Sequence, residues 1–110
     1  MRVLVCGGRD YDDYETVCLT LKQFDIDTII EGGSKGADSL GNRYAVEENI
    51  DVVTFPADWK QFGKRAGFLR NSQMLKEGEP DMVVAFPGGH GTAMMVRISK
   101  QAGVKVIQIT

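Results

Sequence analysis

The chain has 110 residues, 43% of them hydrophobic and 25% charged, with a formal net charge of −2 at pH 7. This length predicts one domain, residues 1–110, with a core of its own, and the slight negative charge excludes a general electrostatic attraction to nucleic acid or anionic lipid. No apolar run approaches the roughly 20 residues of a membrane-spanning helix, and the first residues lack a signal-peptide pattern. We therefore expect a cytoplasmic protein without a membrane partner.

Short β-branched runs alternate with longer segments of helical periodicity along the whole chain. The runs predict strands at residues 2–6, 28–31, 52–55, 82–86 and 104–109. Apolar residues recur at helical spacing within residues 14–24, 40–45 and, more loosely, 94–102. Residues 78–80 are expected to end the helix before the fourth strand, and Gly103 to end the last helix. This order predicts a Rossmann-like, doubly wound three-layer α/β fold with a mainly parallel five-stranded sheet.

Most of the 13 glycines stand just after a predicted strand. They are Gly7 and Gly8 after the first strand, Gly32, Gly33 and Gly36 after the second, and Gly88, Gly89 and Gly91 after the fourth. Because the carboxyl ends of parallel strands lie at one edge of the sheet, the three loops are expected to converge there. Bare backbone N–H groups and helix N-termini bind anions, so we predict a phosphate site at this edge; the alternative is that the glycines only form tight turns.

Four polar residues join the glycines as predicted ligand contacts. Arg9 and Lys35 lie inside two of the glycine-rich loops, where they are either solvated surface residues or contacts to a phosphate. Arg70 and Asn71 place a planar guanidinium beside a side-chain amide, a pair suited to a phosphate or a ribose. The two common nucleotide-binding motifs, GxGxxG and the P-loop, are absent.

The segment FPGGHGT, residues 86–92, holds three glycines in four positions. Pro87 is expected to end the fourth strand, and Thr92 to add a hydroxyl at the start of the next helix. For His90, the only histidine, we expect contact with solvent or with a phosphate, and proton transfer is the alternative. Cys6 and Cys18 form no CxxC pair, so we predict reduced thiols, no metal site and no cofactor.

The segments VLVCGGRDY, IIEGGSKGAD, FPADW, RNSQML and VVAFPGGHGT together resemble the SLOG superfamily, in particular its short YspA-like (YpsA-related) members. The resemblance covers residues 2–106. The element PGGxGT is also similar to the signature of the lonely guy phosphoribohydrolases, long called lysine decarboxylases, and more distantly to the DNA-processing protein A family. The resemblance implies the Rossmann-like fold and a nucleotide phosphate site, and it leaves the reaction open.

One position departs from the phosphoribohydrolase pattern PGGxGTxxE. Arg70 and Met74 keep a spacing that resembles that family, but Met95 stands where the glutamate would be. A methionine neither stabilises an oxocarbenium-like centre nor activates water. The acids that offer themselves as replacements are Asp10, Glu31 and Asp38. Asp38 is explained equally well by support of the following helix, so Arg70 and Asp38 are candidate catalytic residues without an assigned role.

Residues 58–71, DWKQFGKRAGFLRN, contain four cations from Lys60 onward and no acid after Asp58. The aromatic residues Trp59, Phe62 and Phe68 stand between these cations. We predict a lid over one nucleotide, with Trp59 stacked on the base, or a subunit interface. A surface for single-stranded nucleic acid is the less favoured alternative, because one short basic patch on an acidic chain binds a polymer weakly at physiological salt.

These observations predict a protein that binds a nucleotide or nucleotide-derived small molecule, such as an ADP-ribose-like or cyclic nucleotide signal, as a sensor or sequestering module. The first alternative is a nucleotide N-glycosidase, and the second is a DNA-binding protein. Met95 in place of glutamate favours binding over the N-glycosidase, and the slight negative net charge argues against the DNA-binding protein. We also expect a homodimer or larger homo-oligomer, because similar proteins pair through helices and Met94, Met95 and Val96 are apolar; a core role is the alternative explanation of these residues.

Overall fold

The computed structural model describes every residue from Met1 to Thr110. One five-stranded parallel sheet runs through it, made of β1 (Arg2–Cys6), β2 (Thr28–Glu31), β3 (Asp51–Thr54), β4 (Met82–Ala85) and β5 (Lys105–Gln108). The three inner strands are almost wholly buried, while the two edge strands, β3 and β5, keep exposed residues at both ends. The predicted strands are therefore confirmed to within one residue at each end.

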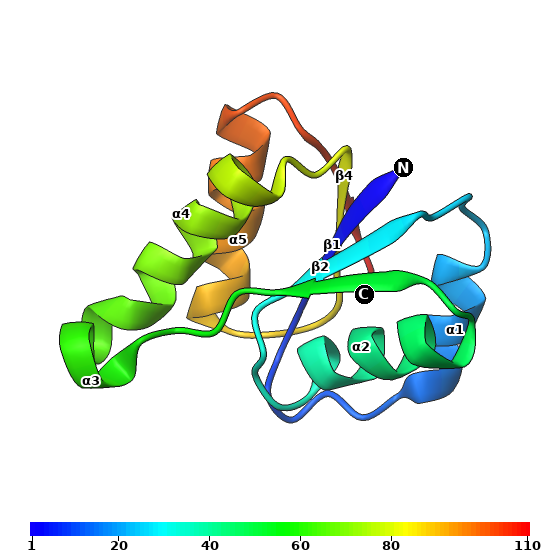
Figure 1. Ribbon diagram of the computed structural model, residues 1–110, viewed down its shortest axis with the longest axis horizontal. Helices are drawn as coiled ribbons and strands as arrows, with labels where there is room; N and C mark the ends of the chain where they lie inside the picture. The colour runs from blue at the N-terminus through cyan, green and yellow to red at the C-terminus, as the bar shows by residue number, and fades with distance from the viewer.

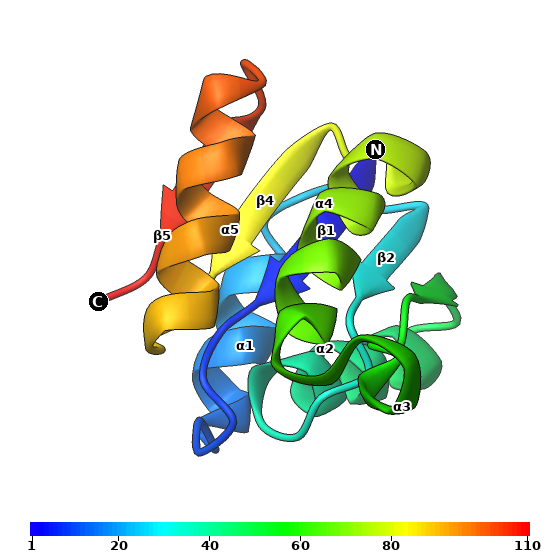
Figure 2. The ribbon, with the colours of Figure 1, turned by 90° about the vertical axis from the view of Figure 1, so that its left-hand side faces the viewer.

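Helices cover both faces of this sheet. They are α1 (Tyr14–Leu21), α2 (Ala37–Glu47), α3 (Trp59–Phe62), α4 (Ala66–Gly78) and α5 (His90–Gln101), with a 3₁₀ turn at Gly63–Arg65 between α3 and α4. Figures 1 and 2 show α1 and α2 on one face and α4 and α5 on the other, with α3 projecting at one end. The predicted doubly wound three-layer fold is confirmed. None of these helices has the length and apolar character that crossing a membrane requires.

The core divides into two layers because successive side chains of a strand point to opposite faces. Val3 and Val5 of β1 pack under α1 and α2, whereas Leu4 and Cys6 pack under α4 and α5. A strand buried on both faces needs apolar residues at every position, which explains the unbroken apolar run in β1. Phe24 continues the apolar spacing of α1 but lies beyond its last residue, and it packs against the core from the following turn.

The helix ends follow the predicted stop signals. α4 ends at Gly78, and Glu79 adopts a left-handed conformation with φ 49°. α5 ends one residue earlier than predicted: Ala102 is its C-terminal cap, and Gly103 follows with φ 78°. A left-handed residue directly after a helix turns the chain back toward the next strand.

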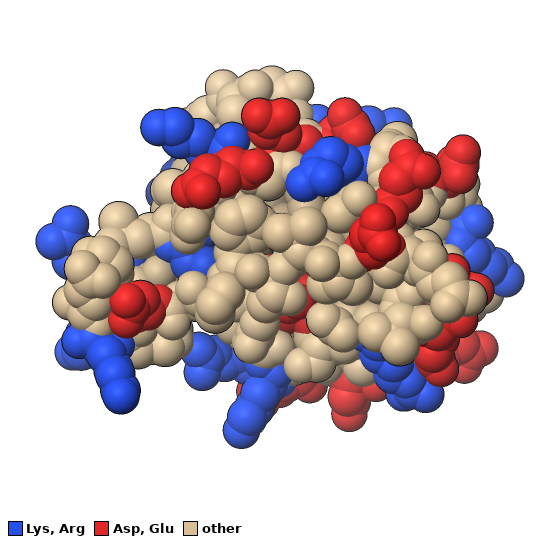
Figure 3. Space-filling view, viewed as in Figure 1, with Lys and Arg blue, Asp and Glu red and all other residues tan.

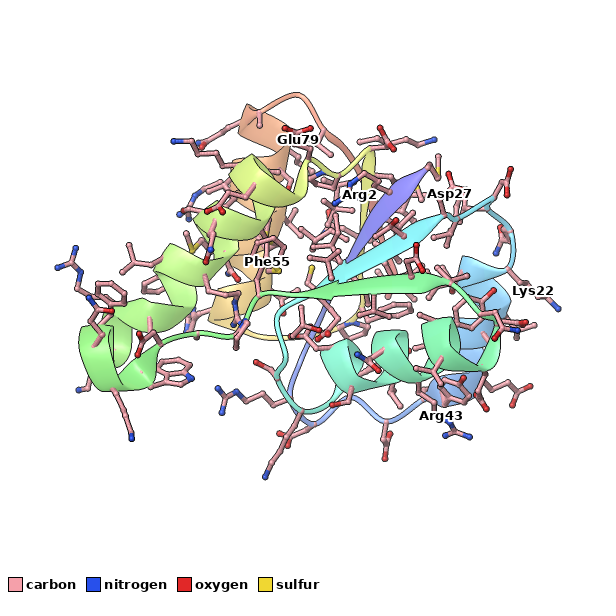
Figure 4. The ribbon with its side chains drawn as sticks, in the orientation of Figure 1. Arg2, Lys22, Asp27, Arg43, Phe55 and Glu79 are labelled. Carbon is pink, nitrogen blue, oxygen red and sulfur yellow. The ribbon has the colours of Figure 1, made fainter.

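The amino-terminal edge of the sheet is held by its own polar contacts. The Met1 ammonium lies 2.8 Å from Asp27 Oδ2, and Arg2 Nε donates to the Gly78 carbonyl oxygen at 2.8 Å. Figure 4 shows Arg2, Asp27 and Glu79 along this upper border of the molecule. These contacts fix the start of β1 relative to β2 and α4.

The strand order β3-β2-β1-β4-β5 creates a switch point between β1 and β4. From β1 the chain moves outward through β2 to β3, then returns to the other side of β1 to form β4 and β5. The connections that leave β1 and β4 therefore go to opposite faces, and a crevice forms at their carboxyl ends. The loops after β1, β2 and β4 all lie along the lower side of the molecule in Figure 1.

Gly8 ties these three loops together. Its N–H donates to the Pro87 carbonyl oxygen at 2.8 Å, and its carbonyl oxygen accepts from the N–H of Ala37 at 3.1 Å. The neighbouring backbone is so close that a Cβ on Gly36 would collide with the Gly8 carbonyl oxygen. Position 36 therefore requires glycine for two reasons: the contact between the two loops and the φ of 77°.

This contact predicts a difference between two glycines that share a positive φ. Gly36 and Gly63 have φ values of 77° and 57°, but a Cβ on Gly63 would meet no atom within 4 Å. We expect Gly63→Ala to lower the free energy of unfolding by roughly 1–3 kcal/mol, the cost of a positive-φ backbone that residues with a Cβ rarely adopt. Gly36→Ala has nearly the same φ and ψ and should lower it by roughly a further 1–3 kcal/mol, because the loops must also separate. Urea unfolding of both variants tests this, and equal losses would contradict the proposed loop contact.

Candidate functional site

A cavity of about 320 Å³ opens at the switch point between β1 and β4. The predicted contact residues that line it are Gly7, Gly8, Arg9, Asp38, Arg70, Asn71, Gly89, Gly91 and Thr92. They come from the loops after β1 and β4, from the starts of α2 and α5, and from the first half of α4. Residues far apart in the sequence thus meet at the edge of the sheet where the glycine-rich loops were expected to converge.

Other predicted contact residues lie outside this cavity. They are Gly32, Gly33, Lys35, Gly36, Trp59, Pro87, Gly88 and His90. Lys35 and His90 are exposed, and Pro87 and Gly88 line a separate hollow beside β5. Trp59 lines an adjoining cavity, described below. The cavity geometry therefore supports only part of the predicted contact set.

The glycines divide into two groups by what surrounds them. A Cβ on Gly7 would come within 2.6 Å of Ala37 Cβ, and one on Gly88 within 2.6 Å of the Gly8 nitrogen. A Cβ on Gly89 or Gly91 would meet nothing within 4 Å. Gly7 and Gly88 have no room for a side chain, because other parts of the chain pack closely against them. Gly89 and Gly91 have room for a side chain, and the space above their backbone opens into the cavity.

The start of α5 has the properties of an anion site. Its N-terminal cap is Gly89, which provides no side-chain hydrogen bond, and its first turn contains no acidic residue. The first-turn N–H groups therefore lack a side-chain acceptor and carry the partial positive charge of the helix N-terminus. Thr92 adds a hydroxyl at the same wall. An anion held here would complete the end of the helix.

Arg70 lies at the opposite side of the site, on α4. Its Nε donates to Asn71 Oδ1 at 3.0 Å, and Nη1 donates to the Gly32 carbonyl oxygen. Asn71 Nδ2 in turn donates to the Gly91 carbonyl oxygen at 3.2 Å. Burial lowers the pKa of Arg70, and the charge of Asp38 acts in the opposite direction. These bonds hold a cationic group at the cavity wall and connect α4 to the start of α5.

Gly32 does not line the cavity, and its backbone contacts the Arg70 side chain. A Cβ at this position would overlap the guanidinium group, which lies directly over the bare backbone. The absence of a side chain at Gly32 therefore allows Arg70 to bond the carbonyl oxygen of the same residue.

Three sulfur-containing residues form the apolar part of the cavity lining. Cys6, Met74 and Met95 are buried, and Met95 is only 1% exposed. Burial, with a smaller contribution from the charge of Asp38, raises the pKa of the Cys6 thiol to about 12. Cys6 is therefore protonated at neutral pH and packs as a small apolar residue.

Met95 also bears on the expected assembly. Met95 and Val96 belong to the core beneath α5, and Met94 is half-buried beside Asn71. The apolar segment is explained by packing within one chain, which was the alternative explanation for it. The homodimer or larger assembly stays a prediction, without support from these residues.

Asp38 is the one acidic residue that lines the cavity. It is 7% exposed, and its Oδ2 accepts a hydrogen bond from the Ser34 N–H at 3.1 Å. Burial raises the pKa of this carboxyl to about 6, although the Ser34 N–H and the Arg70 guanidinium both lower it. The N-terminal cap of α2 is Gly36, without a side-chain bond, so Asp38 does not cap this helix.

The other two candidate acids are placed differently. Glu31 is 2% exposed and accepts hydrogen bonds from the Gly33 N–H, the Thr54 hydroxyl and the Asn42 amide. All three donors belong to the protein, so this carboxylate holds the loop after β2 in place. Asp10 is exposed and lines neither this cavity nor the adjoining one. Of the three acids, only Asp38 faces the site.

A second cavity of about 220 Å³ adjoins the first. Its lining residues are Arg9, Trp59, Lys64, Gly67, Phe68, Arg70, Asn71 and Gly91, four of which also line the first cavity. Trp59 and Phe68 are 49% and 51% exposed, and the Arg9 guanidinium lies 5.8 Å from the centre of a Trp59 ring. Figure 3 shows basic side chains projecting from the end of the molecule formed by α3 and the following turn.

Some lining residues were missed by the sequence reasoning. Ser34 lies inside a glycine-rich loop, and Lys64, Gly67 and Phe68 lie in the basic segment 58–71. The basic segment was recognised as a unit, but its spacing alone does not say which side of a short helix faces the cavity. No group of three His, Cys, Asp or Glu side chains is arranged to bind a metal ion.

Two comparisons with known proteins match this chain. A family model described as YspA, cpYpsA-related SLOG family matches residues 1–62, which include β1, β2, β3 and the glycine-rich loops after the first two strands. The Gene 61 protein of Mycobacterium phage D29 is 35% identical over 119 aligned residues, which cover 96% of this chain and 94% of the phage protein.

The burial of Asp38 predicts a specific pH dependence of stability. Because the folded pKa of about 6 lies above the ordinary value of 3.8, the unfolded chain binds fewer protons between these values, and stability falls as pH rises through this window. The loss amounts to about 3 kcal/mol by pH 7. Asp38→Asn removes the charge but keeps an acceptor for the Ser34 N–H, so this variant should be more stable than wild type at pH 7.

Urea unfolding from pH 4 to pH 7 measures the difference. The charged neighbours Arg70 and Glu31 and the Cys6 thiol remain in both proteins, so only the Asp38 contribution changes. The exposed Asp10→Asn variant serves as the control and should follow wild type. Identical pH profiles for wild type and Asp38→Asn would contradict the assignment.

Proposed function

The chain belongs to the YspA, cpYpsA-related SLOG family, and on this basis we propose that it binds a nucleotide or nucleotide-derived small molecule at the carboxyl edge of the sheet, as a sensor or sequestering module. The observation that carries the proposal is the uncapped start of α5 in the same cavity as the Arg70 guanidinium. A helix N-terminus and an arginine are two independent sources of positive potential, and a phosphate is the common ligand group that satisfies both.

The ligand phosphate is proposed to lie at the start of α5. Gly89 and Gly91 leave room above the backbone, and the Thr92 hydroxyl is available as a further donor. Arg70 is already positioned by Asn71 and by the Gly32 carbonyl oxygen, so little side-chain entropy is lost when it meets the ligand.

The remainder of the ligand is proposed to extend into the adjoining cavity. Trp59 and Phe68 offer half-exposed aromatic rings for a base, and Arg9 and Lys64 offer cations for a second phosphate. Because the two cavities share Arg9, Arg70, Asn71 and Gly91, one molecule can occupy both. An ADP-ribose-like or cyclic nucleotide molecule has this composition.

Binding without hydrolysis is favoured by the lining of the cavity. Met95 contributes no carboxylate, and Glu31 is fully engaged with the protein. One observation favours the alternative of a nucleotide N-glycosidase: Asp38 faces the cavity with a pKa near the range in which a carboxyl exchanges protons at neutral pH. Arg70 and Asp38 would be the catalytic residues of such an enzyme.

The phosphate site is tested by three variants in a thermal-shift and calorimetric assay with AMP, ADP-ribose, NAD and cyclic nucleotides. Arg70→Ala should weaken binding at least about tenfold, since a hydrogen bond to a charged group contributes roughly 1.5–3 kcal/mol. Gly91→Ala should weaken binding by obstructing the phosphate, while its folded state stays intact because the added Cβ meets no protein atom. Arg97→Ala, on the exposed side of α5, is the matched control. Unchanged affinity in the first two variants would refute the site.

The fate of the ligand separates binding from hydrolysis. We expect the nucleotide to be recovered intact by mass spectrometry after incubation and denaturation of the protein, because the lining carries no glutamate at position 95. Release of free base and ribose phosphate, lost in Asp38→Asn and in Arg70→Ala, would instead establish the N-glycosidase. The variant Met95→Glu probes the same point, since a gain of hydrolysis would show that only this carboxylate was missing.

A further inference from the structure

Asp38 is a buried carboxyl group that forms no salt bridge, although it lies inside a site proposed for an anion. It is 7% exposed, forms no ion pair, and accepts no hydrogen bond from a side chain. The nearby Arg70 directs its Nε and Nη1 donors to Asn71 and to the Gly32 carbonyl oxygen. A carboxylate has about four acceptor positions, so the Ser34 N–H bond and the nearby Gly32 N–H still leave acceptor positions open.

The position of this charge opposes the binding of a simple anion. A phosphate at the start of α5 would occupy the same cavity as the Asp38 carboxylate, and two negative charges repel each other more strongly in a partly enclosed site than in water. Asp38 stands in the first turn of α2, where a carboxylate interacts favourably with the helix N-terminus, but it forms no capping hydrogen bond, and its carboxylate bonds the loop N–H of Ser34. A buried polar group that destabilises the fold and faces a cavity indicates a role in ligand recognition.

The acceptor positions of Asp38 need a hydrogen-bond donor from the ligand. A nucleotide has two kinds of neutral donor, the N–H groups of the base and the hydroxyls of the ribose. Asp38 lines the first cavity and not the adjoining one, where the aromatic rings of Trp59 and Phe68 lie. If the base occupies the aromatic cavity and the phosphate the start of α5, the ribose lies between them, and its hydroxyls are the donors within the first cavity.

We infer that Asp38 is a specificity-determining residue that accepts a hydrogen bond from a ribose hydroxyl and thereby selects ribonucleotide ligands over deoxyribonucleotides and over free phosphate. This inference rests on the proposed nucleotide function and adds the chemical group by which the ligand is distinguished. The carboxylate repels every phosphate, and only a ligand that supplies a donor to it recovers the lost affinity. The same residue thus rejects the inorganic anions that are abundant in cells.

Calorimetric titrations of the wild-type protein with AMP, 2′-deoxy-AMP, 3′-deoxy-AMP and inorganic phosphate at pH 7.5 test the inference directly. At least one deoxy compound should bind about tenfold or more weakly than AMP, because it lacks the hydroxyl that bonds a charged acceptor. In Asp38→Asn the difference between AMP and that compound should shrink to about threefold or less, and inorganic phosphate should bind more tightly than to wild type. Asp10→Asn, an acid outside both cavities, should reproduce wild type in every titration.

The outcomes separate the inference from the proposed function. If neither AMP nor inorganic phosphate binds the wild-type protein, the phosphate site itself is wrong and the inference fails with it. If the three nucleotides bind with equal affinity, or if the discrimination persists in Asp38→Asn, the inference alone is overturned. If phosphate binds but AMP does not, the phosphate site stands, and the inference fails together with AMP as a ligand. The comparison of AMP with its deoxy forms on wild-type protein is independent of how any variant folds.

Discussion

The peptide unit of Gly8 joins the three loops that build the candidate site. Its N–H bonds the loop after β4 through Pro87, and its carbonyl oxygen bonds the start of α2 through Ala37. The backbone donor and the backbone acceptor of Gly8 are therefore both used, and the loops are held at a fixed separation. The cavity at the switch point exists because this contact brings the ends of β1, β2 and β4 together while α5 starts on the opposite face.

The same contact divides the glycine-rich loops by function. Gly7, Gly36 and Gly88 are bare because other parts of the chain come close to them, and Gly32 is bare because Arg70 lies over it. Gly89 and Gly91 have open space where a Cβ would stand. A glycine-rich loop therefore carries two different constraints, close packing within the protein and access for a ligand, and only the surroundings of each residue distinguish them.

The electrostatics of the cavity combine attraction with one opposing charge. The uncapped start of α5 and the Arg70 guanidinium favour an anion, while the Asp38 carboxylate disfavours one. Keeping an unpaired carboxylate out of water lowers the stability of the folded protein, and residues of this kind concentrate at functional sites. Next to this cavity, the aromatic rings and cations around Trp59 continue the site away from the sheet.

The sequence by itself determined the layers of this fold, because short apolar runs such as VLVC (residues 3–6) and MVVAF (residues 82–86), with helical spacing between them, are typical of a parallel sheet covered on both faces. The glycine-rich loops also indicated the edge of the sheet at which the cavity lies, and Arg70, Asn71 and Asp38, which the sequence singled out, line that cavity. The tertiary structure alone decided which of three acids faces the cavity, because Glu31 finds its donors within the protein and Asp38 does not. It alone also decided that Met95 and Val96 are core residues. The contacts of these residues depend on distances between segments that are far apart in the sequence, and a local sequence pattern does not give those distances.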